Sequence, residues 1–274
     1  MISFPNAKIN LGLNIIQKRA DDFHDLETIF YPVSGLRDAL EIVHGNATDG
    51  TLNFTHSGLE IAGDTTNNLC SKAYHLLKKD FPELPSIQMH LHKTIPMGAG
   101  LGGGSADGAF TLTMLNQQFG LGLNEQQLIS YALMLGSDCP FFIRNQPSYA
   151  TGRGENMQPV SLDLSMYRFV LINPGIHVST AWAFSQLQPG KPKKSCLAII
   201  QQAVTNWKNQ LVNDFEIPVM QAHPEIQTIR EELYQQGAVY ASMTGSGSTV
   251  YGIFEKNQSA HFNFPPSYFI YQER

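Results

Sequence analysis

The stretch Pro96–Ala109 reads P-M-G-A-G-L-G-G-G-S-A-D-G-A, with glycines at positions 98, 100, 102, 103 and 104. Because glycine has no β-carbon, this backbone can adopt positive φ angles and approach a ligand closely. Ser105 has the side chain of a helix N-cap, and residues 106–119 have helical character and end before Gly120. The stretch therefore predicts a glycine loop opening onto a helix N-terminus, where free N–H groups and the helix dipole favour a bound phosphate.

The neighbouring sequence distinguishes this loop from a flexible turn. Residues 86–95 alternate apolar and polar side chains, as a half-buried strand does. The loop matches G-x-G-x-x-G, but no second strand ending in an acid follows, as a dinucleotide site needs. A Walker loop needs Lys before Ser105, and the protein-kinase triplets H-R-D and D-F-G do not occur. We therefore expect a nucleotide-binding loop of another class.

Composition limits the class of protein. A net charge of −5 and a pI near 6.0 argue against nucleic acid or an anionic membrane as the main partner. The sequence has no run of 18 apolar residues and no signal-peptide pattern at its start, so we expect a cytoplasmic protein. The cysteines at 70, 139 and 196 are too few and too widely spaced for a disulfide framework or a zinc site, so we expect reduced thiols.

The remaining sequence predicts interleaved strands and helices. Expected strands lie at residues 7–16, 28–33, 39–43, 51–55, 86–95, 167–172, 239–243, 249–254 and 268–271, with two short strand-like pieces within 148–160. Expected helices start at Asn67 or Asn68, run from 124 to 136, follow Ser179, cover 198–210 and run from 224 to 237. The length favours two domains, which we place at 1–152 and 153–274, the second as a ferredoxin-like α+β sandwich.

Several polar or aromatic side chains allow two interpretations each, one structural and one functional. Lys8 and Asn10 point to one face of their strand, which is either solvated or turned toward a ligand. Asp138 follows a helix end and precedes Pro140, so it either caps the turn or acts as a base. The Phe23–His24 loop is either a core anchor or a platform for a flat ligand. His90 and His92 share a strand face, but without a third ligand nearby an exposed face is favoured over a metal site.

Three segments, in this order and spacing, resemble the GHMP kinases: P-N-A-K-I-N-L at Pro5–Leu11, P-M-G-A-G-L-G-G-G-S at Pro96–Ser105 and T-G-S-G at Thr244–Gly247. Within the family the chain is most similar to the branch that phosphorylates 4-diphosphocytidyl-2-C-methyl-D-erythritol. That similarity rests on Asn6–Asn10, Arg19–His24, Gly136–Pro140, Asn173–Gly175 and Asn213–Glu216. The chain departs from the branch at Asp22 and Phe23, where Gly and Tyr are common, and at Ser137, where Ala is usual.

The resemblance implies an α+β kinase of two domains, an N-terminal ribosomal protein S5-like αβ domain and a C-terminal ferredoxin-like αβ sandwich, with the active site in the cleft between them. It implies transfer of phosphate from ATP, with Mg²⁺, to the 2-hydroxyl of the cytidine diphosphate substrate on the route to isoprenoid precursors. It names no protein ligand for the metal and suggests a monomer or weak homodimer. One alternative is a GHMP kinase for another small alcohol such as mevalonate or homoserine. A second is a regulatory protein that has lost catalysis, which would lack Lys8 or Asp138.

The resemblance also implies roles for individual residues. Asp138 would accept the proton of the substrate hydroxyl, and Lys8 would keep Asp138 ionised and steady the transferred group. Expected ATP contacts are Asn68, Lys93, Pro96, Met97, Gly98, Ala99, Gly100, Leu101, Gly102, Gly103, Gly104, Ser105 and Ala106. Expected substrate contacts are Asn10, Phe23, His24, Thr180, Phe184, Gly245 and Ser246, with cytosine held between the two phenyl rings and read by His24.

Overall fold

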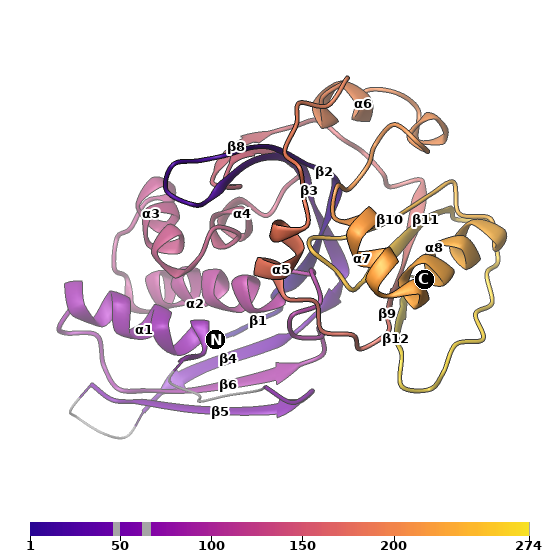
Figure 1. The fold of residues 1–274 in the computed structure, drawn as a ribbon. Helices are drawn as coiled ribbons and strands as arrows, with labels where there is room; N and C mark the ends of the chain where they lie inside the picture. Colours follow the sequence, from indigo (N-terminus) through magenta and orange to yellow (C-terminus); the bar gives the residue numbers. More distant parts are fainter. Residues whose placement is uncertain (46–49, 62–66, 274) are drawn as a thin grey trace. The chain divides into compact units, whose positions relative to one another are not determined.

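The computed structural model describes residues 1–45, 50–61 and 67–273 and is drawn in Figure 1. Its residues form two units that alternate along the chain. Unit 1 comprises Met1–Ala7, Ser34–Met97 and Gly102–Asn145, and unit 2 comprises Lys8–Val33, Gly98–Leu101 and Gln146–Arg274. The tip of the glycine loop thus belongs to unit 2 and its two ends to unit 1. The domain boundary expected after residue 152 stays a prediction.

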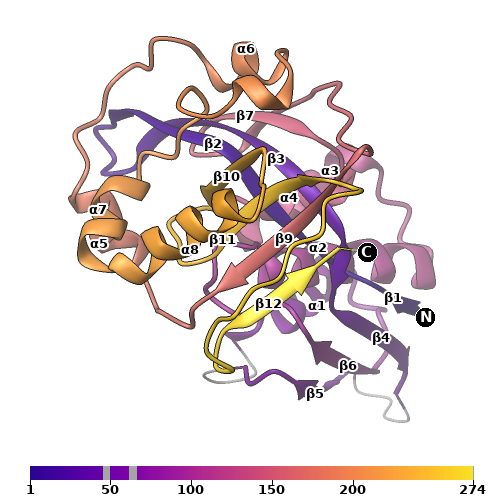
Figure 2. The ribbon, with the colours of Figure 1, turned by 90° about the vertical axis from the view of Figure 1, so that its right-hand side faces the viewer.

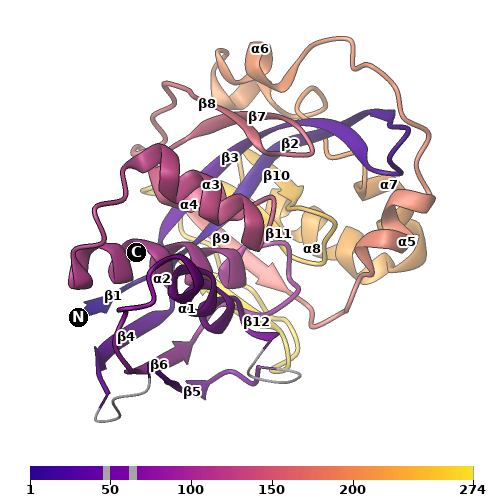
Figure 3. The same ribbon diagram turned by 90° about the vertical axis from the view of Figure 1, so that its left-hand side faces the viewer.

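Unit 1 contains a four-stranded sheet with helices packed on it. The strand order is β1 (Ile2–Ser3), β4 (Ala39–His44), β6 (Ile87–Lys93) and β5 (Leu52–Gly58), with β5 parallel to β6 and the other neighbours antiparallel. Along β6, Ile87, Met89 and Leu91 are buried, as their alternation predicts. The helices α1 (Leu69–Asp80) and α2 (Gly103–Phe119) lie side by side over one face of this sheet (Figures 1 and 3).

Local signals determine where the helices of unit 1 begin and end. Asn68 caps α1 by accepting a hydrogen bond from the N–H of Cys70 at 2.8 Å. Asn124 and Gln127 form the predicted capping box of α3 (Glu125–Leu135), which ends at Gly136. A short helix that we did not predict, α4 (Cys139–Arg144), follows with a proline in its first turn. Because α4 has only six residues, its apolar pattern is too short to show a helical period.

Unit 2 contains most of one sheet and all of another. The first has the order β2 (Asn6–Lys18), β3 (His24–Arg37), β7 (Ser148–Gly152) and β8 (Asn156–Pro159). The second has the order β10 (Tyr240–Met243), β11 (Val250–Glu255), β9 (Tyr167–Asn173) and β12 (Phe269–Gln272), all antiparallel. In chain order these four strands are arranged 2-3-1-4, the order of a ferredoxin-like sheet, so this prediction is confirmed.

Two helices cover the second sheet, and a long loop connects two of its strands. The helices α7 (Glu216–Ala222), which we did not predict, and α8 (Pro224–Gln235), which we did, cover one face of this sheet (Figure 2). The predicted helix after Ser179 is α5 (Thr180–Ser185). The connection from β11 to β12, described throughout, is a loop without a helix. Among the described residues, no helix is both long enough and apolar enough to span a bilayer.

The single long helix expected over 198–210 is wrong. The chain instead forms α6 (Cys196–Ile200) and, after a break, a 3₁₀ turn at Val204–Asn206. Ala203 at the break is extended, with φ −57° and ψ 143°. The turn brings Trp207 into the core, where it is fully buried and packs edge-on against Tyr240 with ring centroids 5.7 Å apart. Burial of the large indole outweighs the helix propensity of the intervening residues.

The three cysteines are free and buried, as expected for reduced thiols. Burial raises the pKa of Cys139 to about 12 and that of Cys70 well above its usual range. Neither thiol is therefore ionised at neutral pH.

Candidate functional site

The glycine loop joins β6 to α2 as the sequence predicts, but the helix begins earlier than expected. Gly98, Gly100 and Gly102 have φ angles of 64°, 77° and 68°, which glycine adopts without steric cost. Gly102 is the N-cap of α2, so the predicted N-cap at Ser105 is wrong. The first hydrogen bond of the helix runs from the N–H of Ala106 to the carbonyl of Gly102, at 2.9 Å. The three N–H groups before it lie at the helix N-terminus, where they can bind an anion.

The other two loop glycines are helical and have different roles. A Cβ on Gly103 would lie 2.9 Å from Ile95 Cγ2 and 3.3 Å from Lys93 Nζ, so Gly103 is needed for close packing. A Cβ on Gly104 would meet Met97 Cε at 4.0 Å and, apart from its chain neighbours and its own helix, no nearer described atom. Gly104 therefore leaves open space beside the first turn of α2.

The tip of the loop packs in unit 2 against the second glycine motif. Thr244 Oγ1 donates to the carbonyl of Gly100 at 3.1 Å, and the N–H of Lys8 donates to the carbonyl of Leu101 at 2.9 Å. A Cβ on Gly100 would lie 2.2 Å from the carbonyl oxygen of Thr244, and a Cβ on Gly245 would lie 3.1 Å from Gly100 Cα. The structure thus brings the two glycine motifs into backbone contact, which only residues without a side chain allow.

The Lys8 strand presents a buried polar face. Lys8 is 4 % exposed, and its Nζ donates to Asn10 Oδ1 at 2.7 Å and lies 4.9 Å from the centroid of the Phe30 ring. The Asn10 oxygen also accepts from the N–H of Gly245 at 3.1 Å, and its amide donates to Thr28 Oγ1 at 3.0 Å. The interpretation of this strand face as solvated is therefore wrong. Asn10, with 2 % of its surface exposed, thus positions Lys8 and the Gly245 turn, and its expected contact with the substrate stays a prediction.

Asp138 lies in unit 1 at the start of α4, two residues after the C-cap of α3 at Gly136. It is half-buried, and its side chain forms no capping hydrogen bond to α4. The next residue, Cys139, lies beside the side chain of Ser105 in the first turn of α2, and α2 and α4 are in contact. This contact brings the start of α4 close to the loop helix. Because Lys8 belongs to unit 2, its approach to Asp138 stays a prediction.

The aromatic residues expected to hold a base have ring and cation partners within unit 2. Phe184 stacks on His24, with centroids 4.7 Å apart and planes 20° apart, and meets Phe215 edge-on at 4.9 Å. No third ring fits between His24 and Phe184 at this separation, and a base between Phe23 and Phe184 stays a prediction. Phe23 is 51 % exposed and lies under the guanidinium of Arg153, 4.8 Å from the ring centroid. We missed Arg153 because we used its T-G-R-G-E segment only to place a boundary.

Two other expected substrate residues are brought together in unit 2. Thr180 is the first residue of α5 and Ser246 lies in the turn between β10 and β11, and their hydroxyl oxygens are 3.0 Å apart. Asn213 Nδ2 supports the same turn by donating to the carbonyl of Gly245 at 2.9 Å. His177, which we did not select, has its Nδ1 3.8 Å from where a Cβ on Gly98 would lie. Its only sequence signal was the preceding N-P-G turn.

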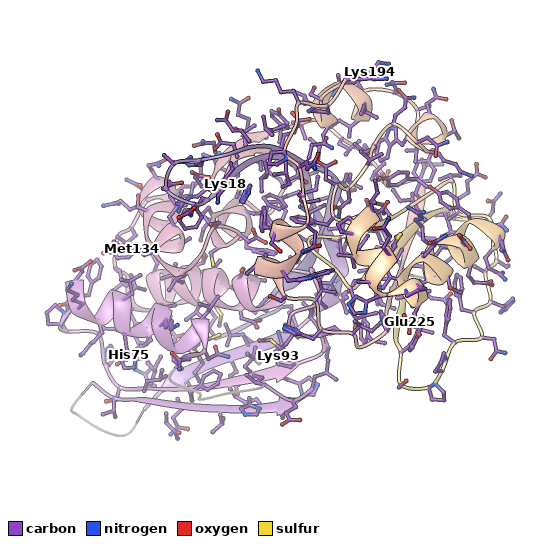
Figure 4. The ribbon with its side chains drawn as sticks, in the orientation of Figure 1. Lys18, His75, Lys93, Met134, Lys194 and Glu225 are labelled. Atoms are coloured by element: carbon purple, nitrogen blue, oxygen red, sulfur yellow. The ribbon has the colours of Figure 1, made fainter. Side chains whose placement is uncertain are left out.

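Two side chains expected to contact ATP have other partners. The carboxamide oxygen of Asn68 is used in capping α1. Lys93, labelled in Figure 4 at the end of β6, is fully buried, and its ammonium contacts the carboxylates of Asp38 and Asp107. The ammonium therefore has no exposed surface for a nucleotide to contact. We missed both acidic partners, Asp38 because it lies 55 positions from Lys93, and Asp107, 14 positions away, because we read its segment only as a helix start.

The exposure of the remaining loop residues limits how they can contact a nucleotide. Ala99, Leu101 and Ala106 are buried, so any ATP contact there involves the backbone, whereas Met97 is exposed. Pro96 is half-buried. His90 and His92 lie on β6, and Ser57 Oγ of the neighbouring strand β5 lies within 3.0 Å of a ring nitrogen of each. Across the described ranges, no three His, Cys, Asp or Glu side chains are grouped to hold a metal ion.

Family models match both halves of the chain. The model of the GHMP kinases N terminal domain matches residues 68–146, which include the glycine loop, α2 and Asp138. The model of the GHMP kinases C terminal domain matches residues 193–262. The chain belongs to the GHMP kinase family.

Individual relatives of this GHMP kinase share a name. The chain is 51 % identical to a 4-diphosphocytidyl-2-C-methyl-D-erythritol kinase of Bacteroides fragilis (strain YCH46), over 94 % of this chain and 93 % of the relative. It is 50 % identical to the kinase of that name from Azobacteroides pseudotrichonymphae, over 98 % of this chain and all of the relative. A crystal structure of 4-(cytidine 5'-diphospho)-2C-methyl-D-erythritol kinase is 30 % identical, with a TM-score of 0.79, over 92 % of this chain and 90 % of that one.

Proposed function

We propose that this chain is an ATP-dependent kinase that phosphorylates the 2-hydroxyl of 4-diphosphocytidyl-2-C-methyl-D-erythritol, on the route to isoprenoid precursors. The observation that carries the proposal is 51 % identity, over nearly the whole chain, to a relative named as a kinase for this substrate. The solved structure of the same name supports it at 30 % identity.

The glycine loop supports the ATP half of the reaction. Three glycines with positive φ turn the backbone around the N-terminus of a 17-residue helix, so that N–H groups and the positive end of the dipole face one point. Phosphate oxygens are the ligands that such a loop favours. The hydroxyl of Ser105, in the first turn, offers one of the hard oxygen ligands that Mg²⁺ prefers. When bound, Mg²⁺ would neutralise charge on the transferred phosphate.

Asp138 and Lys8 would supply the chemistry. In the proposed reaction the substrate 2-oxygen attacks the γ-phosphorus as Asp138 accepts the hydroxyl proton, and the bond from that phosphorus to the β–γ bridging oxygen breaks to release ADP. Lys8 would keep Asp138 ionised, because an opposite charge nearby favours the charged form of a carboxyl. Asn10 holds the ammonium of Lys8 by a 2.7 Å hydrogen bond and so restricts its orientation.

An aromatic cluster favours a substrate that carries a base over mevalonate or homoserine. His24, Phe184 and Phe23 gather rings near the start of β3 and on α5, and Phe23 is exposed. Nucleobases stack on such rings, whereas neither smaller alcohol has a flat face to bind. From this arrangement we propose that cytosine stacks on the exposed Phe23 ring, or takes the place of His24 on Phe184.

A coupled assay of ADP release tests the proposal. The purified chain is incubated with ATP and Mg²⁺ in three separate reactions, which contain the cytidine diphosphate substrate, mevalonate or homoserine as the acceptor. We expect ADP release only with the cytidine substrate. Turnover with mevalonate or homoserine instead would assign the chain to another branch of the family, and ATP binding without turnover on any alcohol would favour a regulatory protein.

A further inference from the structure

A buried group of three charged side chains lies in unit 1 beneath the glycine loop. The Lys93 ammonium donates to Asp107 Oδ2 at 2.8 Å and to Asp38 Oδ2, and the three side chains have between 0 % and 2 % of their surface exposed. Asp38 lies between β3 and β4, Lys93 ends β6 and Asp107 lies in α2. We name Asp38, Lys93 and Asp107 the buried triad. It links three elements that meet at the loop.

The triad contacts both ends of the loop. Asp38 Oδ1 accepts hydrogen bonds from the N–H groups of Thr94 and Ile95, at 2.6 and 2.9 Å, and so fixes the chain that leads into the loop. At the other end, Lys93 Nζ lies 3.3 Å from where a Cβ on Gly103 would be. Asp107 lies four residues further along α2 and ties the helix to the same ammonium. The entry to the loop and the start of the phosphate-binding helix are thereby held by one lysine.

The charges of the triad do not balance, because two carboxylates share one ammonium. Asp107 Oδ1 has no hydrogen-bond partner within the part of the chain that the structure describes, although it is buried. Burial raises the pKa of Asp107 to about 7, with the Asp38 charge adding to the rise and Lys93 opposing it. Cys70 of α1 and Thr111 of α2 are the other polar groups that meet here, and the Cys70 thiol is neutral. A buried charge set that is this costly needs a reason to be kept.

We propose that Asp38, Lys93 and Asp107 are positioning residues that set the spacing between the entry of the glycine loop and the first turn of α2, and thereby the affinity for the phosphates of ATP. This inference rests on the proposed function, because it assumes that the loop binds ATP. No member of the triad touches the nucleotide in this account. Their effect is on where the backbone N–H groups of the loop lie, and a displacement of about 1 Å in such groups can cost 100-fold in activity.

Substitutions at Asp107 separate positioning from general stability. Asp107→Leu removes the acceptor but leaves the Lys93–Asp38 pair neutral overall, so the variant should fold even where Lys93→Met does not. Asp107→Asn keeps an oxygen that accepts from Lys93. Leu128→Ala, in the buried face of α3, serves as a control that lowers stability in the same unit without touching the triad.

Titration calorimetry measures the dissociation constants of each variant for ATP and for the cytidine substrate. The melting temperature of each variant is measured alongside. We expect Asp107→Leu to weaken ATP binding by about 10-fold or more while the cytidine substrate binds as before. We expect the dissociation constant of Asp107→Asn for ATP to stay within about 3-fold of that of the wild type, and Leu128→Ala to lower the melting temperature alone.

Normal ATP binding by Asp107→Leu, or parallel loss of binding of both ligands, would overturn the inference. A wild-type chain that binds ATP but not the cytidine substrate would refute the proposed function and leave the ATP comparison intact.

Discussion

At the scale of single residues, the proposed reaction depends on Asp138 acting together with Lys8. Asp138→Asn should lower kcat by about 100-fold to 10,000-fold, because it removes the proton acceptor, and should leave the affinity for ATP nearly unchanged. Lys8→Met should lower kcat as well, and the double variant should be little worse than the more damaging single one, since residues that act as a unit are not additive. Independent, multiplicative losses in steady-state kinetics, or loss of ATP binding by Asp138→Asn, would contradict this pairing.

The buried carboxyl of Asp107 gives a prediction on pH and stability. Its pKa in the folded protein is about 7, against 3.8 as the ordinary value. Between these values the folded state holds a proton that the unfolded state has lost, so stability from this group falls as pH rises toward 7. The amide introduced by Asp107→Asn does not titrate. The free energy of unfolding of this variant should therefore rise relative to that of the wild type through this range, by on the order of 1 kcal/mol or more at pH 8. Urea unfolding from pH 4.5 to 8 measures the difference, and a gap that does not change with pH would contradict the prediction.

Phe23 tests how the cytidine ring is held. Stacking of a base on an aromatic side chain contributes about 1–3 kcal/mol, so Phe23→Ala should raise KM for the cytidine substrate by roughly 5-fold to 150-fold and leave KM for ATP unchanged. Because the ring is half exposed, the melting temperature should change little. Phe4→Ala is a matched control, since Phe4 is 53 % exposed and lies in unit 1. An unchanged KM for the cytidine substrate in Phe23→Ala would show that the base stacks elsewhere.

At the scale of elements, we propose that α2 and its loop form the ATP site, and Gly104 is the position that tests this proposal most cleanly. Gly104→Val should preserve the fold, because its Cβ has space, and should abolish ATP binding, because the side chain enters the space beside the helix N-terminus. Gln117→Val, at an exposed position of the same helix, controls for the helix propensity of valine. Calorimetric titration with ATP distinguishes the two variants. Normal ATP binding by Gly104→Val would mean that the phosphates bind away from this turn.

The elements that could be predicted are those with a local signal. Apolar and polar side chains alternate along β6, Asn124 and Gln127 form a capping box, and α2 and α3 each end at a glycine. Each of these features follows from a short stretch of sequence. The predicted helix over 198–210 failed because burial of Trp207 depends on residues far along the chain. Ser105 was given the role of N-cap because its side chain suits one, whereas the left-handed glycine at 102 starts the helix sooner.

At the scale of the whole molecule, the candidate site could be predicted in its residue types but not in their pairings. The two glycine motifs meet through Thr244 and Gly100, 144 positions apart, and Lys93 pairs with Asp38 across 55 positions. Such pairings are set by the order of strands in the sheets and leave no trace in either local segment. The partners that the structure shows for the side chains of Asn10 and Lys93 are accordingly other parts of the chain, which the sequence did not indicate.

Transfer of phosphate to the 2-hydroxyl of the cytidine diphosphate substrate can be tested by ³¹P NMR of the reaction product. Carbon 2 of the methylerythritol unit carries a methyl group and no hydrogen, so a phosphate on its oxygen has no proton three bonds away. We expect one new phosphomonoester resonance, a singlet in the proton-coupled spectrum, with the diphosphate resonances of the substrate retained and ADP formed in equal amount. A doublet or triplet, which a phosphate on oxygen 3 or 1 would give, or consumption of ATP without any new phosphomonoester, would contradict it.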